Sequence, residues 1–187
     1  MDEFGYLSVL LSIIVGLAVA QILIGMRGCM LTRSRVRPFW PVQWWAVIFL
    51  LISAQTWWAM FSLRNRHTWD FVAFAVLLAQ VIILYLVTGL IYPDFVLERE
   101  VNLRTHYFEQ RRHFFSLCVA MLLLSICRDL VLNHALPEPL NLAFHLAFIA
   151  FAISGILFTS EWYHKLAAVV IAGILVTYVV VLFSRLQ

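Results

Sequence analysis

Six long apolar stretches, separated by short charged connections, fill this chain almost from end to end. A transmembrane helix needs about 20 largely apolar residues to cross a hydrocarbon core about 30 Å thick. The stretches that meet this requirement are residues 4–26, 41–63, 71–92, 114–132, 140–158 and 166–183. The sequence therefore predicts an all-helical bundle of six transmembrane helices.

The composition excludes a soluble globular protein. Of the 187 residues, 64% are hydrophobic and 12% are charged, and the mean hydropathy is +0.93. So few charges could not cover a water-facing surface. The longest connection, residues 93–113, is too short to fold a core of its own. We therefore expect residues 1–187 to form a single integral membrane domain without a soluble catalytic module.

Arginine and lysine are distributed unequally between the two sides of the predicted bundle. The first, third and fifth connections carry nine of them and the opposite side carries four. Because cytoplasmic loops retain positive charge, both termini are predicted on the outer face of the membrane. Arginine outnumbers lysine twelve to one, which indicates a GC-rich bacterial genome and hence the bacterial cytoplasmic (inner) membrane. The net charge of +3 indicates contact with anionic membrane lipids, with no nucleic acid as partner.

The first span carries a small side chain at every fourth position: Ser8, Ser12, Gly16 and Ala20. Such a ridge lets membrane helices approach closely and gain dispersion contacts. We expect it to pack against another helix of the same chain. The alternative is a contact between subunits, which would make the protein a homo-oligomer. In either case, leucine at position 16 should disturb the contact.

The second span carries a tryptophan pair near each end. Trp44 and Trp45 lie near one end, and Trp57 and Trp58 lie about 20 Å away along a helix. Indole rings prefer the boundary between lipid and water. The four tryptophans are therefore predicted to anchor the depth of this helix, and an aromatic ligand cage is the alternative.

One glutamine lies deep in each of the first three spans: Gln21, Gln55 and Gln80. A carboxamide in hydrocarbon costs several kcal/mol unless its donors and acceptors find partners. These side chains should therefore face the protein interior. Either they bond to one another as interhelical glue, or they line a polar pathway for an ion or small solute.

Ionisable groups at membrane depth extend this hypothesis to Arg128, Asp129 and His145, because such groups are costly there and indicate a functional site by default. They are candidates for an outward-facing polar cavity shared with the glutamines. Alternatively, Arg128 extends its charge to the headgroups and His145 is a neutral packing residue. Asp129 is rotated about 100° from Arg128 around a helix, so we do not expect a direct ion pair between them.

Residues 94–112 contain most of the charged connection between the third and fourth spans. Their apolar and charged residues favour an amphipathic helix on the cytoplasmic membrane surface. Arg104, Arg111 and Arg112 are predicted to contact lipid phosphate there. Docking of a partner protein or a nucleotide is the alternative.

Recognised catalytic and metal-binding motifs are absent from the sequence. It contains no nucleophile elbow, phosphate-binding glycine loop or zinc motif, so no catalytic or metal-binding residue is assigned. The three cysteines give no disulfide framework, because Cys118 and Cys127 are about 13.5 Å apart along one helix. The sequence identifies no cofactor, and it does not favour an enzyme.

A set of motifs resembles small uncharacterised multi-span membrane proteins of bacterial genomes. The shared features are residues 6–12, Gly16-Leu17, Gln21, Gly25, the tryptophan pairs, Tyr107, Arg111-Arg112 and Phe114-Phe115. They cover roughly the first two-thirds of the chain. The resemblance implies a polytopic membrane protein but carries no assigned activity, cofactor or substrate.

The most favoured function is a homo-oligomeric channel or transporter for an ion or small solute. Its pathway would use Gln21, Gln55, Gln80 and His145, and a pore would lie between subunits because one small chain can hardly enclose it. The first alternative is a scaffold or sensor subunit that recruits a partner or lipid through residues 94–112. The second is an intramembrane redox or lipid-modifying enzyme.

Overall fold

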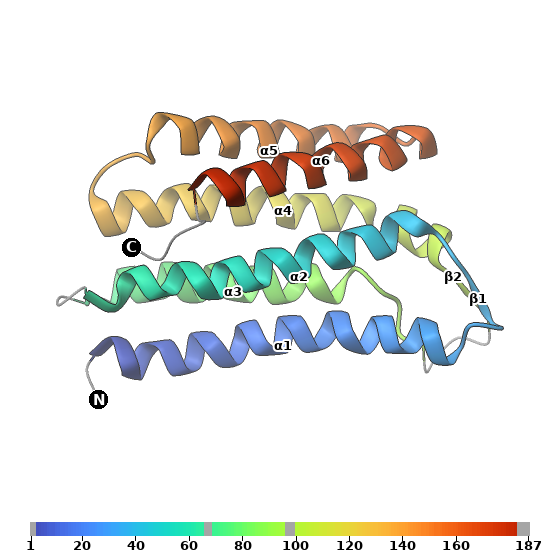
Figure 1. Cartoon of the computed structure of the whole chain (residues 1–187), viewed down its shortest axis with the longest axis horizontal. Helices are drawn as coiled ribbons and strands as arrows, with labels where there is room; N and C mark the ends of the chain where they lie inside the picture. The colour runs from blue at the N-terminus through green and yellow to red at the C-terminus, as the bar shows by residue number, and fades with distance from the viewer. Residues whose placement is uncertain (1–2, 66–68, 96–99, 183–187) are drawn as a thin grey trace.

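The structure of the protein is a computed structural model, and residues 3–65, 69–95 and 100–182 of it are described. Within these residues, helices dominate and run along the long axis of the molecule (Figure 1). They are α1 (Glu3–Leu31), α2 (Trp40–Met60), the short 3-10 helix η1 (Phe61–Asn65), α3 (Phe71–Gly89), α4 (Leu103–Asn133), α5 (Pro139–Leu157) and α6 (Glu161–Leu182). The predicted all-helical class is confirmed.

Five helices of the described chain are long and apolar enough to cross a membrane. These segments are Phe4–Leu31, Trp40–Arg64, Phe71–Gly89, Leu103–Asn133 and Pro139–Leu157. Large apolar side chains are exposed on all six α-helices, as Ile24, Val72 and Val169 illustrate. Lipid tails cover such surfaces readily, whereas monomeric soluble proteins rarely expose them on this scale. The sixth span, 166–183, stays a prediction, and its last residue lies outside the described residues.

Helices α2 to α6 form a closed ring, and α1 lies outside it. Around the ring, α2 packs on α3, α3 on α4, α4 on α5, α5 on α6, and α6 on α2. Helix α1 packs on α2 and α3 and occupies one edge of the molecule (Figure 1). The interior of the bundle is therefore enclosed by five helices, and α1 covers the outer surface of two of them.

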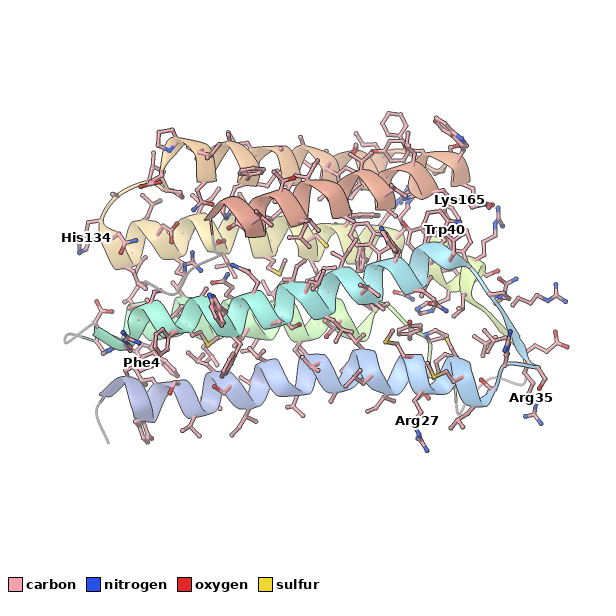
Figure 2. The ribbon with its side chains drawn as sticks, viewed as in Figure 1. Phe4, Arg27, Arg35, Trp40, His134 and Lys165 are labelled. Atoms are coloured by element: carbon pink, nitrogen blue, oxygen red, sulfur yellow. The ribbon has the colours of Figure 1, made fainter. Side chains whose placement is uncertain are left out.

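The two ends of the bundle differ in charge. Figure 2 shows Arg27, Arg35, Trp40 and Lys165 at one end and Phe4 and His134 at the other. We call the first the basic end; it holds the α1–α2, α3–α4 and α5–α6 connections (Figure 1). The arginine-bearing connections thus share one end, as alternating spans require. That this end faces the cytoplasm stays a prediction.

Helix α4 begins at Leu103 rather than at the predicted residue 114. The Asn102 side chain caps it by accepting from the backbone N–H groups of Arg104 and Thr105, at 3.1 and 3.3 Å. The prediction of a separate surface helix over residues 94–112 is wrong, because residues 103–112 are the first turns of α4. Residues 96–99 of that segment lie outside the described residues.

A short parallel β-bridge ties two connections together at the basic end. Strand β1 (Val36–Arg37) pairs with β2 (Val101–Asn102), and Val36 is in register with Val101. The Val101 N–H also donates to the carbonyl of Arg35 at 3.0 Å. A pair of two-residue strands is too short for alternating hydropathy to reveal, so the sequence analysis missed it.

Close helix packing uses glycines other than the predicted ridge. A Cβ placed on Gly16 would have no heavy atom within 4 Å, so this glycine makes no close contact within the chain. A Cβ on Gly155 of α5 would lie 2.8 Å from the Phe115 ring of α4, which is almost fully buried. The predicted contact of Gly16 with another helix of the same chain is wrong. A contact of Ser8, Ser12, Gly16 and Ala20 with a second subunit stays a prediction.

We expect Gly155→Ala to destabilise the protein by about 1–3 kcal/mol, because overpacking a filled interior forces side chains and backbone to shift. The matched Gly16→Ala variant should be neutral or slightly stabilising, because alanine is the better helix former. Thermal unfolding of both purified variants in the same detergent checks this. Equal stability of the two variants would contradict the assigned packing.

Candidate functional site

The ring of five helices lines a half-open cavity of about 130 Å³ in the part of the chain that the structure describes. All five helices contribute to its wall, and α1 contributes none. The lining residues are Trp45, Ile48, Phe49, Ile52, Gln55, Thr56, Gln80, Phe115, Cys118, Met121, Leu122, Ser125, His145, Phe148, Phe151, Ala152, Ile171, Leu175 and Tyr178. At about 30 Å³ for each water in the liquid, the space could hold about four water molecules.

The cavity has an apolar half and a polar half. Trp45 on α2 and Phe115 on α4 line the half nearer the basic end. Gln55 on α2 and Ser125 on α4 line the other half, ten residues or about 15 Å further along each helix. No Asp, Glu, Lys or Arg lines it among the described residues. The cavity therefore combines an aromatic wall with uncharged hydrogen-bonding groups.

The carboxamides of Gln55 and Gln80 face this cavity without a partner. Neither makes a hydrogen bond to the other or to any protein group within residues 3–65, 69–95 and 100–182. A glutamine that served as interhelical glue would show such a bond. Because unsatisfied amides are costly in an apolar interior, both side chains require water or a solute in the cavity.

Gln21 does not belong to this site. It lies on α1, outside the ring, and its Nε2 donates to the hydroxyl of Tyr85 on α3 at 3.0 Å. This bond joins α1 to α3. Gln21 therefore forms the interhelical hydrogen bond that the glue hypothesis predicts. The structure thus separates Gln21 from Gln55 and Gln80, although all three glutamines follow an alanine in the sequence.

His145 lines the polar half with both ring nitrogens engaged. Nδ1 lies 2.8 Å from the carbonyl of Asn141, so it carries the proton and donates. Nε2 lies 3.0 Å from the hydroxyl of Ser125. The ring therefore bridges α5 to α4 through both of its nitrogens. As arranged here, neither nitrogen is available to ligate haem iron or another metal.

Arg128 and Asp129 form a direct ion pair, which the sequence analysis did not expect. The Arg128 Nη2 and Nε atoms lie 2.9 and 3.0 Å from Asp129 Oδ1. The long guanidinium side chain bends around the helix and overcomes the rotation of 100° between neighbours. Neither residue lines the cavity; the pair lies about one turn beyond Ser125, towards the end of α4.

The four tryptophans predicted to anchor α2 differ in exposure and in contacts. Trp57 and Trp58 are exposed, and Trp44 is exposed while its Nε1 donates to the Ala168 carbonyl at 2.7 Å. Trp45 is buried in the core, with its ring centroid 5.2 Å from Phe114 and 5.6 Å from Phe115. The prediction that Trp45 is an interface anchor is wrong. Its indole instead belongs to the aromatic wall of the cavity.

The three arginines predicted to contact lipid are in three different environments. Arg104 is exposed and its Nε lies 2.6 Å from Glu161 Oε2, which joins α4 to α6. Arg112 is exposed, so its lipid contact stays a prediction. Arg111 is only 6% exposed, so the prediction that it binds lipid is wrong. Its Nη1 instead donates to the Phe158 carbonyl at 2.8 Å.

A buried polar cluster beside Arg111 was missed by the sequence analysis. The Tyr107 hydroxyl lies 2.9 Å from His164 Nδ1, and His164 Nε2 lies 2.9 Å from the Phe158 carbonyl. The sequence analysis assigned no role to His164. The only available signal was that Tyr107 and Arg111 are one turn apart, on one side of α4.

Clusters of three or more His, Cys, Asp or Glu side chains that could hold a metal ion do not occur among the described residues. Comparison of the chain with protein-family models, with curated proteins and with solved structures gives no match. What the site can do therefore follows from its own side chains.

We expect cysteines at positions 55 and 80 to react with a charged, water-soluble methanethiosulfonate in a background without Cys29, Cys118 and Cys127. The reason is that water must reach the unpaired carboxamides that they replace. Cysteine at position 21 should stay unreactive, because Gln21 is bonded away from the cavity. Mass spectrometry of the labelled protein in liposomes measures this, and equal protection at all three positions would contradict a hydrated cavity.

The Arg104–Glu161 contact predicts a pH dependence. Glu161 precedes the predicted sixth span, and hydrogen bonds from Lys165 and Arg104 hold the pKa of its carboxyl below the ordinary value. A lowered pKa in the folded state stabilises the protein above the ordinary glutamate pKa of about 4.3, and this contribution disappears as the pH falls. The difference in melting temperature between wild type and Glu161→Gln should therefore shrink from pH 7 to pH 4. A difference that stays constant with pH would exclude this contribution.

Proposed function

We propose that this chain is a multi-pass membrane protein that binds small uncharged solutes in the cavity inside α2–α6 and passes them across the bilayer. The observation that carries this proposal is the pair of unpaired carboxamides, Gln55 and Gln80, which face one cavity at membrane depth. A dry cavity would leave both unsatisfied, at several kcal/mol each. A solute or water that accepts and donates hydrogen bonds removes this cost.

The lining favours a neutral solute over an ion. An ion that leaves water needs charged or closely spaced dipolar groups to replace its hydration shell. This cavity offers two carboxamides, the hydroxyl of Thr56, and a histidine whose ring nitrogens are both already bonded. Its other half is aromatic. A solute of about ten non-hydrogen atoms or fewer, with a polar and an apolar part, matches both halves.

The cavity lies within one chain, which changes the first hypothesis. The sequence analysis placed a pore between subunits, but the described unpaired glutamines are enclosed by the five-helix ring of a single subunit. Assembly as a homo-oligomer and location in the bacterial inner membrane remain parts of the proposal that rest on the sequence alone. The exposed ridge at Gly16 is the surface that a second copy would use.

The test is solute flux into liposomes that contain the purified protein. Stopped-flow light scattering should show faster entry of glycerol and urea than in protein-free liposomes, whereas potassium and sodium flux should stay at the background level. Gln55→Leu and Gln80→Leu should lower the neutral flux several-fold, because leucine removes the hydrogen-bonding groups. Gln21→Leu is the matched control, because it removes a glutamine that also lies within an apolar span but does not line the cavity.

Two results would overturn the proposal. If folded wild-type protein passes neither neutral solutes nor ions, the scaffold hypothesis, with exposed Arg112 at the basic end as its contact, is favoured instead. If ions pass and neutral solutes do not, the assignment of the substrate class is wrong. A bound chromophore or quinone in the purified protein would favour the redox enzyme.

A further inference from the structure

A half-open pocket of about 550 Å³ lies at the basic end, between the end of α1 and the start of α2. Most of its lining comes from the segment 26–38, which contains Arg27 and Arg35 (Figure 2). The lining residues are Met26, Cys29, Met30, Arg33, Val36, Pro38, Gln43 and Tyr92. None of them lines the solute cavity, so this pocket is a separate feature of the molecule.

Three sulfur-bearing side chains of α1 share this pocket. Cys29 and Met30 follow Met26 by three and four residues, the spacings at which helical side chains meet with their Cβ atoms about 5–6 Å apart. Met26 and Cys29 are half-buried against the core, and Met30 is exposed. Methionine turns about three bonds, so both thioethers can adjust towards the thiol. With metal–thiolate bonds of about 2.3 Å, the three sulfurs can reach one ion between them.

Neighbouring residues fix the position of the Cys29 sulfur. The Gln43 Nε2 donates to Cys29 Sγ at 3.9 Å, and the Tyr92 hydroxyl donates to Gln43 Oε1 at 3.1 Å. Tyr92 can lie against α1 because position 25 is glycine, where a Cβ would overlap with its ring. Outer hydrogen bonds of this kind orient the ligands of known metal sites. The pocket thus presents a held sulfur together with two adaptable ones.

The lining selects a soft, monovalent metal ion. Thiolate and thioether ligands favour Cu(I), whereas zinc takes His, Asp or Glu besides Cys, and none of these three lines the pocket among the described residues. Arg33 adds a permanent positive charge to the lining. One thiolate neutralises a monovalent ion, but it would leave a divalent ion with a net positive charge beside this guanidinium.

We propose that Met26, Cys29 and Met30 bind one Cu(I) ion in this pocket. Binding forms a copper–sulfur bond from each of them, breaks the S–H bond of Cys29 and releases that proton to water. The copper stays Cu(I) throughout, so the step needs neither an oxidant nor a reductant. The site does not rest on the proposed solute flux, and variants of the two sites fail separately.

The test is transfer of Cu(I) from its bicinchoninate complex to the purified full-length protein, in detergent and without oxygen. We expect one tightly bound Cu(I) per chain, sulfur as the only neighbour in copper X-ray absorption, and displacement by Ag(I) but not by Zn(II). Cys29→Ser should abolish the transfer. Cys127→Ser, which removes an exposed cysteine outside the pocket, should retain it.

Methionine variants distinguish a three-sulfur site from adventitious binding at the cysteine alone. Met26→Leu and Met30→Leu should each weaken Cu(I) binding about tenfold or more through the loss of one ligand, since loss of an outer contact already costs about 10–100-fold. Both variants should fold, because leucine nearly conserves the volume. Met60→Leu is the matched control, because Met60 is a buried methionine at the opposite end of α2.

Three results would overturn the proposal. The first is folded wild-type protein that takes no Cu(I) from the bicinchoninate complex. The second is equal affinity in wild type, Met26→Leu and Met30→Leu, which would show binding by Cys29 alone. The third is displacement of the copper by Zn(II), which would show that the site does not select a soft monovalent ion.

Discussion

Hydrocarbon offers no hydrogen bonds, and this constraint governs almost every polar side chain in the bundle. The protein meets it mostly with local pairs: Gln21 with Tyr85, His145 with Ser125 and Asn141, and Arg128 with Asp129. These pairs join neighbouring helices or cover a charge at low cost. The polar groups without a protein partner are exceptions, because each of them needs a bound water or solute to satisfy its hydrogen bonds.

The ring has two cavities, of about 130 and about 10 Å³, which differ in the polar groups that line them. The buried Asn141 Oδ1 at the start of α5 is a further atom without a partner within the described residues. Carboxamides that can donate and accept, without charge, face the larger space. The smaller one is lined by the Arg111 guanidinium and by Gln110 and Tyr107, whose oxygens can accept, and Trp45 lines both. The proposal of a neutral solute therefore rests on the groups that line the larger cavity and not on similarity to another protein.

The all-helical class and five of the long apolar helices could be predicted from the sequence because they depend on apolar length, although α4 begins well before its predicted span. The orientation of each helix about its own axis could not. In a soluble protein the polar face reveals which side is buried, but here both the lipid-facing and the inward-facing sides are apolar. Adjacent residues point about 100° apart, so Trp44 and Trp45, or Arg111 and Arg112, received one assignment although their environments differ.

Because lipid-facing and inward-facing sides are both apolar, the sequence also failed to predict which glycine is closely packed and where α4 begins. A regular ridge at Gly16 was visible, yet the crowded position is Gly155, whose neighbour Phe115 is 40 residues away and on another helix. Helix α4 continues through residues 103–112, where charged and apolar side chains alternate, because tertiary contacts and the Asn102 cap support it. Pairs that are far apart in sequence leave no local pattern.

Trp45 is a shared wall, and this has a thermodynamic consequence. Any guest that displaces the indole from one side changes the shape of the compartment on the other side. If occupancy of the larger compartment favours one position of the ring, the affinity of the smaller compartment changes by a fixed factor, and linkage requires the reverse effect to have the same size. The position of one aromatic side chain thus couples binding in two cavities that are lined by different groups.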